Sequence, residues 1–318
     1  MSNYNKLWVL QNPNPVLDSV KHINRKKGAK SIATYDFSTL YTKLPHDKLV
    51  KELHKLIDFV FKGGDKKYIK INKWGKAFWG KKTKDSVGFT CNSLKVAVKH
   101  LIENCFFKVG NAVLRQAIGI PMGIDPAPFW ANLFLYSYEN TYMTDLIASD
   151  KRKARHFHST KRFIDDLCAL NDGGEFGRVY KDIYPNELDL KVEHSGSHAS
   201  FLNLDITIRD GLFVYKLFDK RDDFPFSIVR MPYISSNIPE SIFYSAMVGE
   251  FLRIARSTLL FNDFLPKARE LIHRLNNQGA NQLISNRHLR KIIHRHPDDF
   301  SHFRIDTEEI LNLVNQEQ

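Results

Sequence analysis

The stretch Lys161-Arg162-Phe163-Ile164-Asp165-Asp166-Leu167-Cys168-Ala169-Leu170 sets two adjacent carboxylates among apolar residues. Adjacent acids on their own more often mark a solvated turn. Here the neighbouring residues predict a strand over residues 163–170, and successive strand residues point to opposite faces of a sheet. Asp165 and Asp166 at a bend in such a strand cannot both be well exposed. Crowded carboxylates repel each other, and divalent cations with oxygen ligands relieve that repulsion.

A further acid, Asp36, ends another β-prone run, Ser-Ile-Ala-Thr-Tyr at residues 31–35. The chain then enters a helix that we predict over residues 46–61, after Pro45. A strand ending in Asp36 beside a strand pair carrying Asp165 and Asp166 would collect carboxylates at one rim of a sheet. Two metal ions about 3.5–4 Å apart at such a rim suit phosphoryl transfer, in which positioning and charge neutralisation supply most of the catalysis.

The composition points to a globular protein with a polyanionic partner. The 318 residues are 43% hydrophobic, and 47 Lys and Arg against 35 Asp and Glu give a net charge of +12. Such an excess favours nucleic acid, because each Lys or Arg on a phosphate releases a counterion. No apolar run approaches the roughly 18 residues of a membrane-spanning helix. The three cysteines form no C-x-x-C pair, which favours a reduced intracellular compartment.

A lysine-rich segment, residues 62–84, contains nine lysines and one acid, Asp65. Its glycines and its alternation predict a hairpin or an extended insertion. A solvated loop is the simpler interpretation of any single charge run, and it stays open. Aromatic residues among the lysines favour a nucleic-acid contact, with lysines on phosphates and rings on bases. The candidate contacts are Lys73, Trp74, Lys76 and Trp79.

The remaining pattern mixes helices and strands. We predict helices over residues 91–106, 128–148, 239–260, 266–276 and 280–295, and strands over residues 106–109, 112–117, 201–208 and 212–218. Gly110-Asn111 suits a tight turn between two of these strands. The aromatic residues of the 128–148 helix are expected to be mostly core.

Three of these segments resemble polymerase motifs A, B and C of reverse transcriptases, and they occur in that order. They are Asp36 to Thr42, Gly119 to Leu135, and Phe163 to Asp166. Residues 201–206, 215–226 and 236–239 extend the resemblance to the reverse transcriptases of Penelope-like retroelements, from about residue 31 to about residue 300.

The resemblance implies an α+β fold: a polymerase palm, which is a ferredoxin-like antiparallel sheet with helices, plus a helical thumb and incomplete fingers. It assigns residues 1–30 to a partial fingers or N-terminal segment and residues 31–210 to the palm, with the insertion at 62–84. It assigns residues 211–318 to the thumb and a helical C-terminal region.

Site roles follow from the same resemblance. Asp36 and Asp165 would be ligands of two Mg²⁺ or Mn²⁺ ions, with Asp166 beside them and the Phe37 carbonyl assisting. Tyr41 would exclude a 2′-hydroxyl, although an ordinary core tyrosine is the alternative. The other implied residues are Met122, Gly123 and Lys191 for the nucleotide, Phe201, Leu202 and Asn203 for the primer grip, and Arg253 and Arg256 for the duplex backbone. For Lys191, Arg253 and Arg256 a solvated surface position is the alternative.

The implied function is RNA-directed DNA polymerase of a retroelement. Its partners would be an RNA template, a DNA primer and deoxynucleoside triphosphates, with no membrane, in the nucleus of a eukaryotic host.

The sequence departs from the family pattern in three ways. Only 35 residues precede Asp36, no GIY-YIG endonuclease motif is found, and Asp125 stands where the motif B loop would carry a small polar residue. These departures favour the main alternative, a truncated or decayed copy that binds nucleic acid without polymerase activity. A nucleotide cyclase on a palm-like sheet is a further alternative, since fold alone does not decide function. A non-enzymatic RNA-binding module would give no reason for the three aspartates to crowd together.

Overall fold

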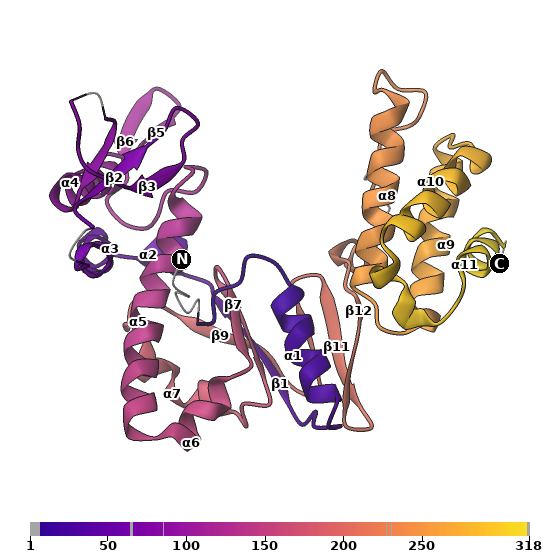
Figure 1. The fold of residues 1–318 in the computed structure, drawn as a ribbon, viewed down its shortest axis with the longest axis horizontal. Coiled ribbons are helices and arrows are strands. Elements are labelled where there is room, and N and C mark those ends of the chain that lie inside the picture. The colour runs from indigo at the N-terminus through magenta and orange to yellow at the C-terminus, as the bar shows by residue number, and fades with distance from the viewer. Residues whose placement is uncertain (1–6, 64–65, 85, 227, 230, 317–318) are drawn as a thin grey trace. The chain divides into compact units, whose positions relative to one another are not determined.

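The computed structural model describes residues 7–63, 66–84, 86–226, 228–229 and 231–316. The chain divides into two compact units (Figure 1). Unit 1 consists of Met1–Val16 and Ser31–Ser195, and unit 2 consists of Leu17–Lys30 and Gly196–Gln318. Asp65, the single acid of the lysine-rich segment, lies outside the described residues.

Unit 1 is built on a four-stranded sheet in the order β7-β8-β1-β9. The strands are β7 (Thr160–Phe163), β8 (Asp166–Leu170), β1 (Ile32–Phe37) and β9 (Leu190–Gly196). The two central strands, β1 and β8, pair antiparallel, with Ile32 opposite Leu170 and Asp36 opposite Asp166. Both are almost wholly buried, which explains why they read as near-continuous apolar runs up to the acids.

Helices supply the rest of the core of unit 1. They are α2 (Leu40–Lys43), α3 (His46–Phe61), α4 (Cys91–Glu103), α5 (Ala127–Ser149), α6 (Lys151–Ala154), the 3₁₀ turn η1 (Arg155–Phe157) and α7 (Glu175–Ile183). α3 confirms the prediction over residues 46–61 and buries Leu49 and Leu53. α5 confirms the aromatic helix, although Phe129 is exposed instead of core. The Tyr35 ring of β1 meets Phe176 of α7 at 4.8 Å between centroids.

Two smaller sheets complete unit 1. The lysine-rich segment folds as β2 (Tyr68–Ile71) and β3 (Ala77–Trp79), and β4 (Gly88–Thr90) joins them in the order β3-β2-β4. This confirms a hairpin and adds a third strand. The second sheet is the predicted hairpin, β5 (Phe106–Val109) and β6 (Ala112–Arg115).

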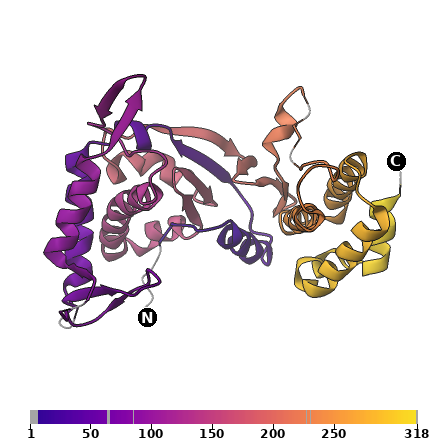
Figure 2. The same cartoon turned by 90° about the horizontal axis from the view of Figure 1, so that it is seen from above.

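Unit 2 combines a three-stranded sheet with a helical bundle. The sheet contains β10 (His198–Phe201), β11 (Leu204–Arg209) and β12 (Leu212–Leu217) in that order. The helices are most of α1 (Asn14–Asn24), α8 (Glu240–Arg256), α9 (Phe261–Asn277), α10 (Gln282–Arg295) and α11 (Thr307–Asn315), with 3₁₀ turns η2 (Lys220–Asp223), η3 (Pro297–Asp299) and η4 (Ser301–Phe303). Helices α8 to α11, the orange and yellow group in Figure 2, pack around their own apolar core. Within the described ranges, no helix is long and apolar enough to span a membrane.

Candidate functional site

The central strands of unit 1 bring the motif aspartates together. Side chains alternate along β1, and Ala33, Tyr35 and Phe37 enter the main core of the unit. Asp36 therefore points to the other face of the sheet, where the register sets it opposite Asp166 on β8. The N–H of Phe37 donates to the backbone oxygen of Asp165 at 3.1 Å. The carboxylates predicted from separate parts of the sequence thus meet at one end of the strand pair.

A tight turn presents Asp165. The sequence predicted one strand over residues 163–170. β8 confirms it for residues 166–170, but it was wrong at residues 163–165, where β7 ends and a turn begins. β7 ends at Phe163, β8 begins at Asp166, and these two residues are register partners. Ile164 takes a left-handed backbone with φ of 55°. A β-branched residue is rarely found there, so its type gave no sign of a turn.

The electrostatics of the site agree with crowded carboxylates. The pKa of the Asp36 carboxyl is raised above its ordinary value, mainly by burial and then by the negative charges of Asp165 and Glu193, while Lys191 opposes the shift. Asp165 also adds to the effect of burial in raising the pKa of the Tyr41 hydroxyl. Asp165 therefore lies within electrostatic reach of both Asp36 and Tyr41.

Glu193 is a site residue that the sequence interpretation missed. It lies two residues after Lys191 on β9, the strand beside β1, so the two side chains share a face of the sheet. The two-residue spacing of Lys191 and Glu193 was the one signal in the sequence that could have linked Glu193 to the site. Residues 190–196 were not predicted as a strand, because their mostly exposed side chains give little apolar periodicity.

The motif B loop packs against the segment that follows Asp36. The N–H of Ile120 donates to the Tyr41 carbonyl at 2.8 Å, and the N–H of Gly119 donates to the Leu44 carbonyl at 2.8 Å. His46 bonds the Gly119 carbonyl through Nε2 at 2.8 Å. Met122 and Gly123 follow in the exposed part of the loop. Tyr41 itself is half-buried against the core of unit 1.

The predicted primer-grip residues belong to unit 2, and the structure shows only their local setting. Phe201 is buried, Leu202 has a φ of 56° in the turn between β10 and β11, and the Asn203 side chain donates to Ser257 Oγ at 2.8 Å. Arg253 pairs with Glu250 at 2.6 Å. Arg256 pairs with Asp299 at 2.7 Å. The nucleic-acid roles of these residues stay predictions.

The donor set at the site fits hard divalent ions. Asp36, Asp165 and the Phe37 carbonyl offer oxygen only, which Mg²⁺ and Mn²⁺ prefer. Across the described part of the chain, no group of three or more His, Cys, Asp and Glu side chains is placed to hold a metal ion. Mg²⁺ commonly binds through one or two carboxylates together with substrate phosphates, so a two-carboxylate site is adequate for it.

Comparison with solved structures relates this fold to telomerase. Telomerase from Candida albicans, in complex with the TWJ fragment of telomeric RNA, matches with a TM-score of 0.63 at 11% identity, over 98% of this chain and 53% of that chain. Apo telomerase from Candida tropicalis matches with a TM-score of 0.51 at 11% identity, over 98% of this chain and 50% of that one. The chain has a reverse-transcriptase-like fold.

The reverse-transcriptase-like fold agrees with the α+β architecture implied by motifs A, B and C. This chain spans about half the length of each of these telomerase chains. No protein-family model matches the sequence, and no curated protein does either.

Asp36→Asn should slightly stabilise unit 1 when no divalent ion is present. Because the folded-state pKa of Asp36 is raised, its ionisation disfavours folding at pH 7. The gain should be only about 0.5 kcal/mol, since water screens a partly open carboxylate. It should vanish as the pH falls below the ordinary value of 3.8, where the acid is protonated in both states. Thermal unfolding in a chelator across this pH range measures the effect, and a destabilised variant at pH 7 would contradict it.

Proposed function

We propose that the chain is an RNA-directed DNA polymerase that extends a DNA primer on an RNA template. The observation that carries the proposal is the meeting of Asp36 on β1 with the Asp165-Asp166 hairpin. In a reverse-transcriptase-like fold, carboxylates at this place suit nucleotidyl transfer. The RNA named in the Candida albicans telomerase structure supports an RNA partner for a chain of similar fold.

Asp36 and Asp165, with the Phe37 carbonyl, would hold two Mg²⁺ or Mn²⁺ ions, and Asp166 would complete the negative rim. Bound ions would activate the primer 3′-hydroxyl and neutralise charge on the leaving pyrophosphate. The chain itself prepares the site by holding Asp36 where burial, and then the charges of Asp165 and Glu193, disfavour its ionisation. A bound cation would relieve that repulsion, so ion binding would stabilise the strand arrangement that brings the carboxylates together.

The surroundings of the aspartates suit a nucleotide. Tyr41 would lie beneath the sugar and exclude a 2′-hydroxyl, with its backbone fixed by the bond from Ile120. Met122 and Gly123 would border the base in the open part of the motif B loop. Lys191, whose positive charge reaches Asp36, would donate a proton to the departing pyrophosphate.

The finer assignments belong to the same proposal. Residues 31–210 would form the palm and residues 211–318 the thumb. Phe201, Leu202 and Asn203 would grip the primer, and Arg253 and Arg256 would contact the duplex backbone. Motif similarity to Penelope-like elements favours a retroelement enzyme that acts in the nucleus of a eukaryotic host.

Primer extension is the direct test. A DNA primer annealed to an RNA template should be extended by the wild-type chain with Mg²⁺ or Mn²⁺, and not by Asp165→Asn. If neither protein extends the primer while both bind primer–template, the alternative of a decayed, binding-only copy is correct. Asp125 in the motif B loop is the feature that favours this alternative, because its charge would repel a template phosphate.

A basic and aromatic surface on the β2–β3 hairpin would contact the nucleic acid. Trp74 is 73% exposed, and the Lys73 ammonium lies 4.5 Å from its ring centroid. Trp79 is less free, since it packs edge-on against Phe61 of α3 at 5.0 Å between centroids. Lys76 lies between the two tryptophans in the sequence. An exposed tryptophan ring with a lysine ammonium beside it suits stacking on an unpaired base.

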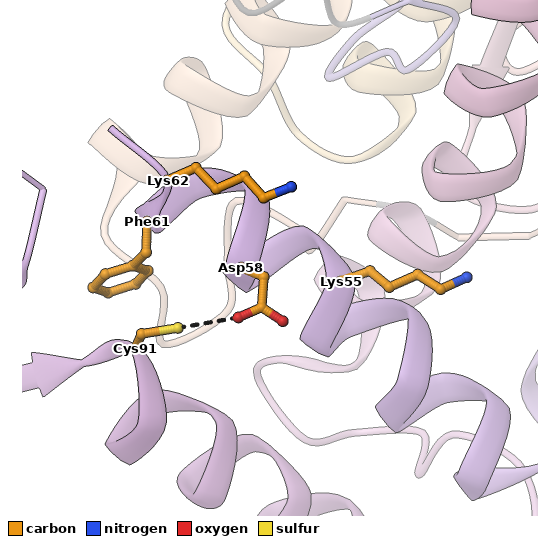
Figure 3. A pocket seen from close by; sticks show the side chains of 5 residues that line it. All are labelled: Lys55, Asp58, Phe61, Lys62 and Cys91. Atoms are coloured by element: carbon orange, nitrogen blue, oxygen red, sulfur yellow. Dashed lines mark hydrogen bonds between the residues drawn. The ribbon is translucent and has the colours of Figure 1, made fainter. Parts of the chain in front are cut away.

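A cavity of about 540 Å³ is lined by residues of α3, by Lys62 just after it and by the start of α4. Figure 3 shows Lys55, Asp58, Phe61 and Lys62 projecting from α3, with Cys91 at the start of α4. The Cys91 thiol donates to Asp58 Oδ1 at 3.4 Å, and burial followed by this hydrogen bond raises the pKa of the thiol. Lys95 pairs with Asp58 at 2.5 Å, which compensates the carboxylate charge beside the cavity.

Trp74→Ala should weaken binding of single-stranded RNA about tenfold, because stacking on one exposed ring contributes about 1–3 kcal/mol. The salt dependence of binding should not change, since no cation is lost. Leu283→Ala, which truncates a side chain 79% exposed on α10, is the control and should leave the affinity unchanged. Fluorescence anisotropy over a salt series measures both quantities. Equal affinities for wild type and Trp74→Ala would mean that the hairpin is solvated at Trp74 and that this ring does not contact the nucleic acid.

A further inference from the structure

A fully buried arginine holds the hairpin that carries Asp165. Arg162 lies on β7, its side chain is 0% exposed, and its partner Glu139 on α5 is also 0% exposed. Nε donates to Glu139 Oε1 at 2.5 Å, and Nη2 donates to Oε2 at 3.1 Å. This is a two-point contact, which fixes the plane of the guanidinium group.

The same guanidinium reaches the turn. Nη1 donates to the Ile164 carbonyl at 2.7 Å and to Asn132 Oδ1 at 2.9 Å, and Nη2 also donates to the Asn132 carbonyl at 3.3 Å. A guanidinium group has five N–H donors, and these contacts with Glu139, Asn132 and Ile164 use all five. Tyr184 supports the far end by donating to Glu139 Oε1 at 2.9 Å. Arg162 therefore couples α5, and through Glu139 the Tyr184 side chain just after α7, to one backbone carbonyl of the turn.

That carbonyl belongs to the strained residue of the turn. Ile164 has a φ of 55°, a conformation that a β-branched residue adopts only when the surroundings enforce it. The next residue is Asp165, whose own backbone oxygen accepts from the Phe37 N–H. The direction in which the Asp165 carboxylate leaves the hairpin thus depends on two backbone anchors, one from β1 and one from Arg162.

Stability alone does not explain a charge at this place. Replacing a buried ion pair with apolar side chains of similar volume is often neutral or stabilising. An apolar pair could fill the space of Arg162 and Glu139, but it could not donate to the Ile164 carbonyl. Arg162 supplies what an apolar side chain could not, a hydrogen-bond donor to the Ile164 carbonyl just before Asp165.

We propose that Arg162 is a positioning residue that orients Asp165 for divalent-ion binding through the Ile164 carbonyl. The inference rests on the proposed function only for the role of that ion in polymerisation. Partners that support ligand residues in this way typically change metal affinity or activity by about 10–100-fold when they are removed.

The test compares an apolar triple variant with a matched control. The triple variant carries Arg162→Met, Glu139→Met and Tyr184→Phe, so that neither an unpaired charge nor an orphaned hydroxyl remains. The control carries Tyr184→Phe alone, which removes one hydrogen bond of the network but leaves Arg162 on the Ile164 carbonyl. For each protein one measures the Mn²⁺ concentration that gives half of the maximal thermal stabilisation, amide exchange in residues 163–167, kcat of primer extension, and the Kd for primer–template.

We expect the triple variant to need about 10–100-fold more Mn²⁺. Its turn amides should exchange faster than those of wild type, and its kcat should fall by a similar factor while the Kd for primer–template stays the same. The control should match wild type in all four quantities. If the triple variant does not fold, Arg162→Lys takes its place, because an ammonium has three N–H donors and cannot make all five contacts of the Arg162 guanidinium.

Several outcomes would overturn the inference. A folded triple variant with the wild-type Mn²⁺ midpoint and wild-type exchange would make Arg162 a purely structural residue. Wild type that is not stabilised by Mn²⁺ would also overturn it. If wild type extends no primer but the Mn²⁺ midpoint shifts as expected, the polymerase proposal fails and the positioning role stands.

Discussion

We expect the Asp165→Asn variant to lose divalent-ion-dependent primer extension by about 10³-fold or more, equivalent to about 4 kcal/mol of transition-state stabilisation. An amide keeps the shape of the side chain but removes the negative charge that a cation requires. The backbone bond from Phe37 to the Asp165 oxygen is unaffected, so the hairpin should keep its register. The loss should therefore fall on kcat, with the Kd for primer–template retained.

Two further measurements make this result specific. Asp145→Asn removes the same charge from an exposed position on α5 and should extend primers at the wild-type rate. The pKa of Asp36 is raised by burial and, after burial, by the charge of Asp165. Because Asp165→Asn removes that charge, thermal unfolding in a chelator should show the variant at least as stable as wild type. An Asp165→Asn protein that extends primers within a few-fold of wild type would remove Asp165 from the metal site.

Local sequence patterns were sufficient for much of the fold. The apolar spacing of residues 46–61 predicted α3 to the residue, and Gly110-Asn111 predicted the turn between β5 and β6. Asp36 could be placed at the end of a strand because Ile32 to Tyr35 is β-prone on both faces. These features depend on neighbours in the sequence, where propensity and periodicity act directly.

The missing parts of the prediction depend on long-range contacts. Ile164 takes a turn conformation that its side chain disfavours, and the bond from Arg162 to its carbonyl is one of the contacts that hold it there. Arg162 in turn depends on Glu139, 23 residues away on another element. Glu193 joins the aspartates only because β9 lies beside β1. A residue in a disfavoured conformation at a candidate site is the place where local rules are expected to fail.

Gly119 joins motif A to motif B, and Gly119→Ala should cost unit 1 about 3 kcal/mol. Its backbone has a φ of 85°, and an added Cβ would lie 2.3 Å from the Tyr41 carbonyl oxygen. A left-handed alanine costs about 1–2 kcal/mol. The clash is with backbone, and moving Tyr41 would also break the 2.8 Å hydrogen bond from Ile120, which contributes about 1 kcal/mol.

Gly123→Ala is the matched control for this substitution. Gly123 has a φ of 95° in the same loop, but its added Cβ would meet nothing within 4 Å, so only the left-handed cost of about 1–2 kcal/mol applies. The four tryptophans, Trp8, Trp74, Trp79 and Trp130, all lie in unit 1, so their fluorescence during urea unfolding reports on this unit.

The same pair of variants tests whether the contact between the motifs serves the nucleotide. Because Gly119→Ala must displace the Tyr41 backbone, it should raise the KM for deoxynucleotides and weaken rejection of ribonucleotides in the surviving folded protein. Gly123→Ala should leave sugar discrimination intact, since its Cβ reaches no part of Tyr41. Equal stability and equal discrimination in the two variants would mean that the loop accommodates the Gly119→Ala Cβ without moving Tyr41, which would contradict the predicted clash.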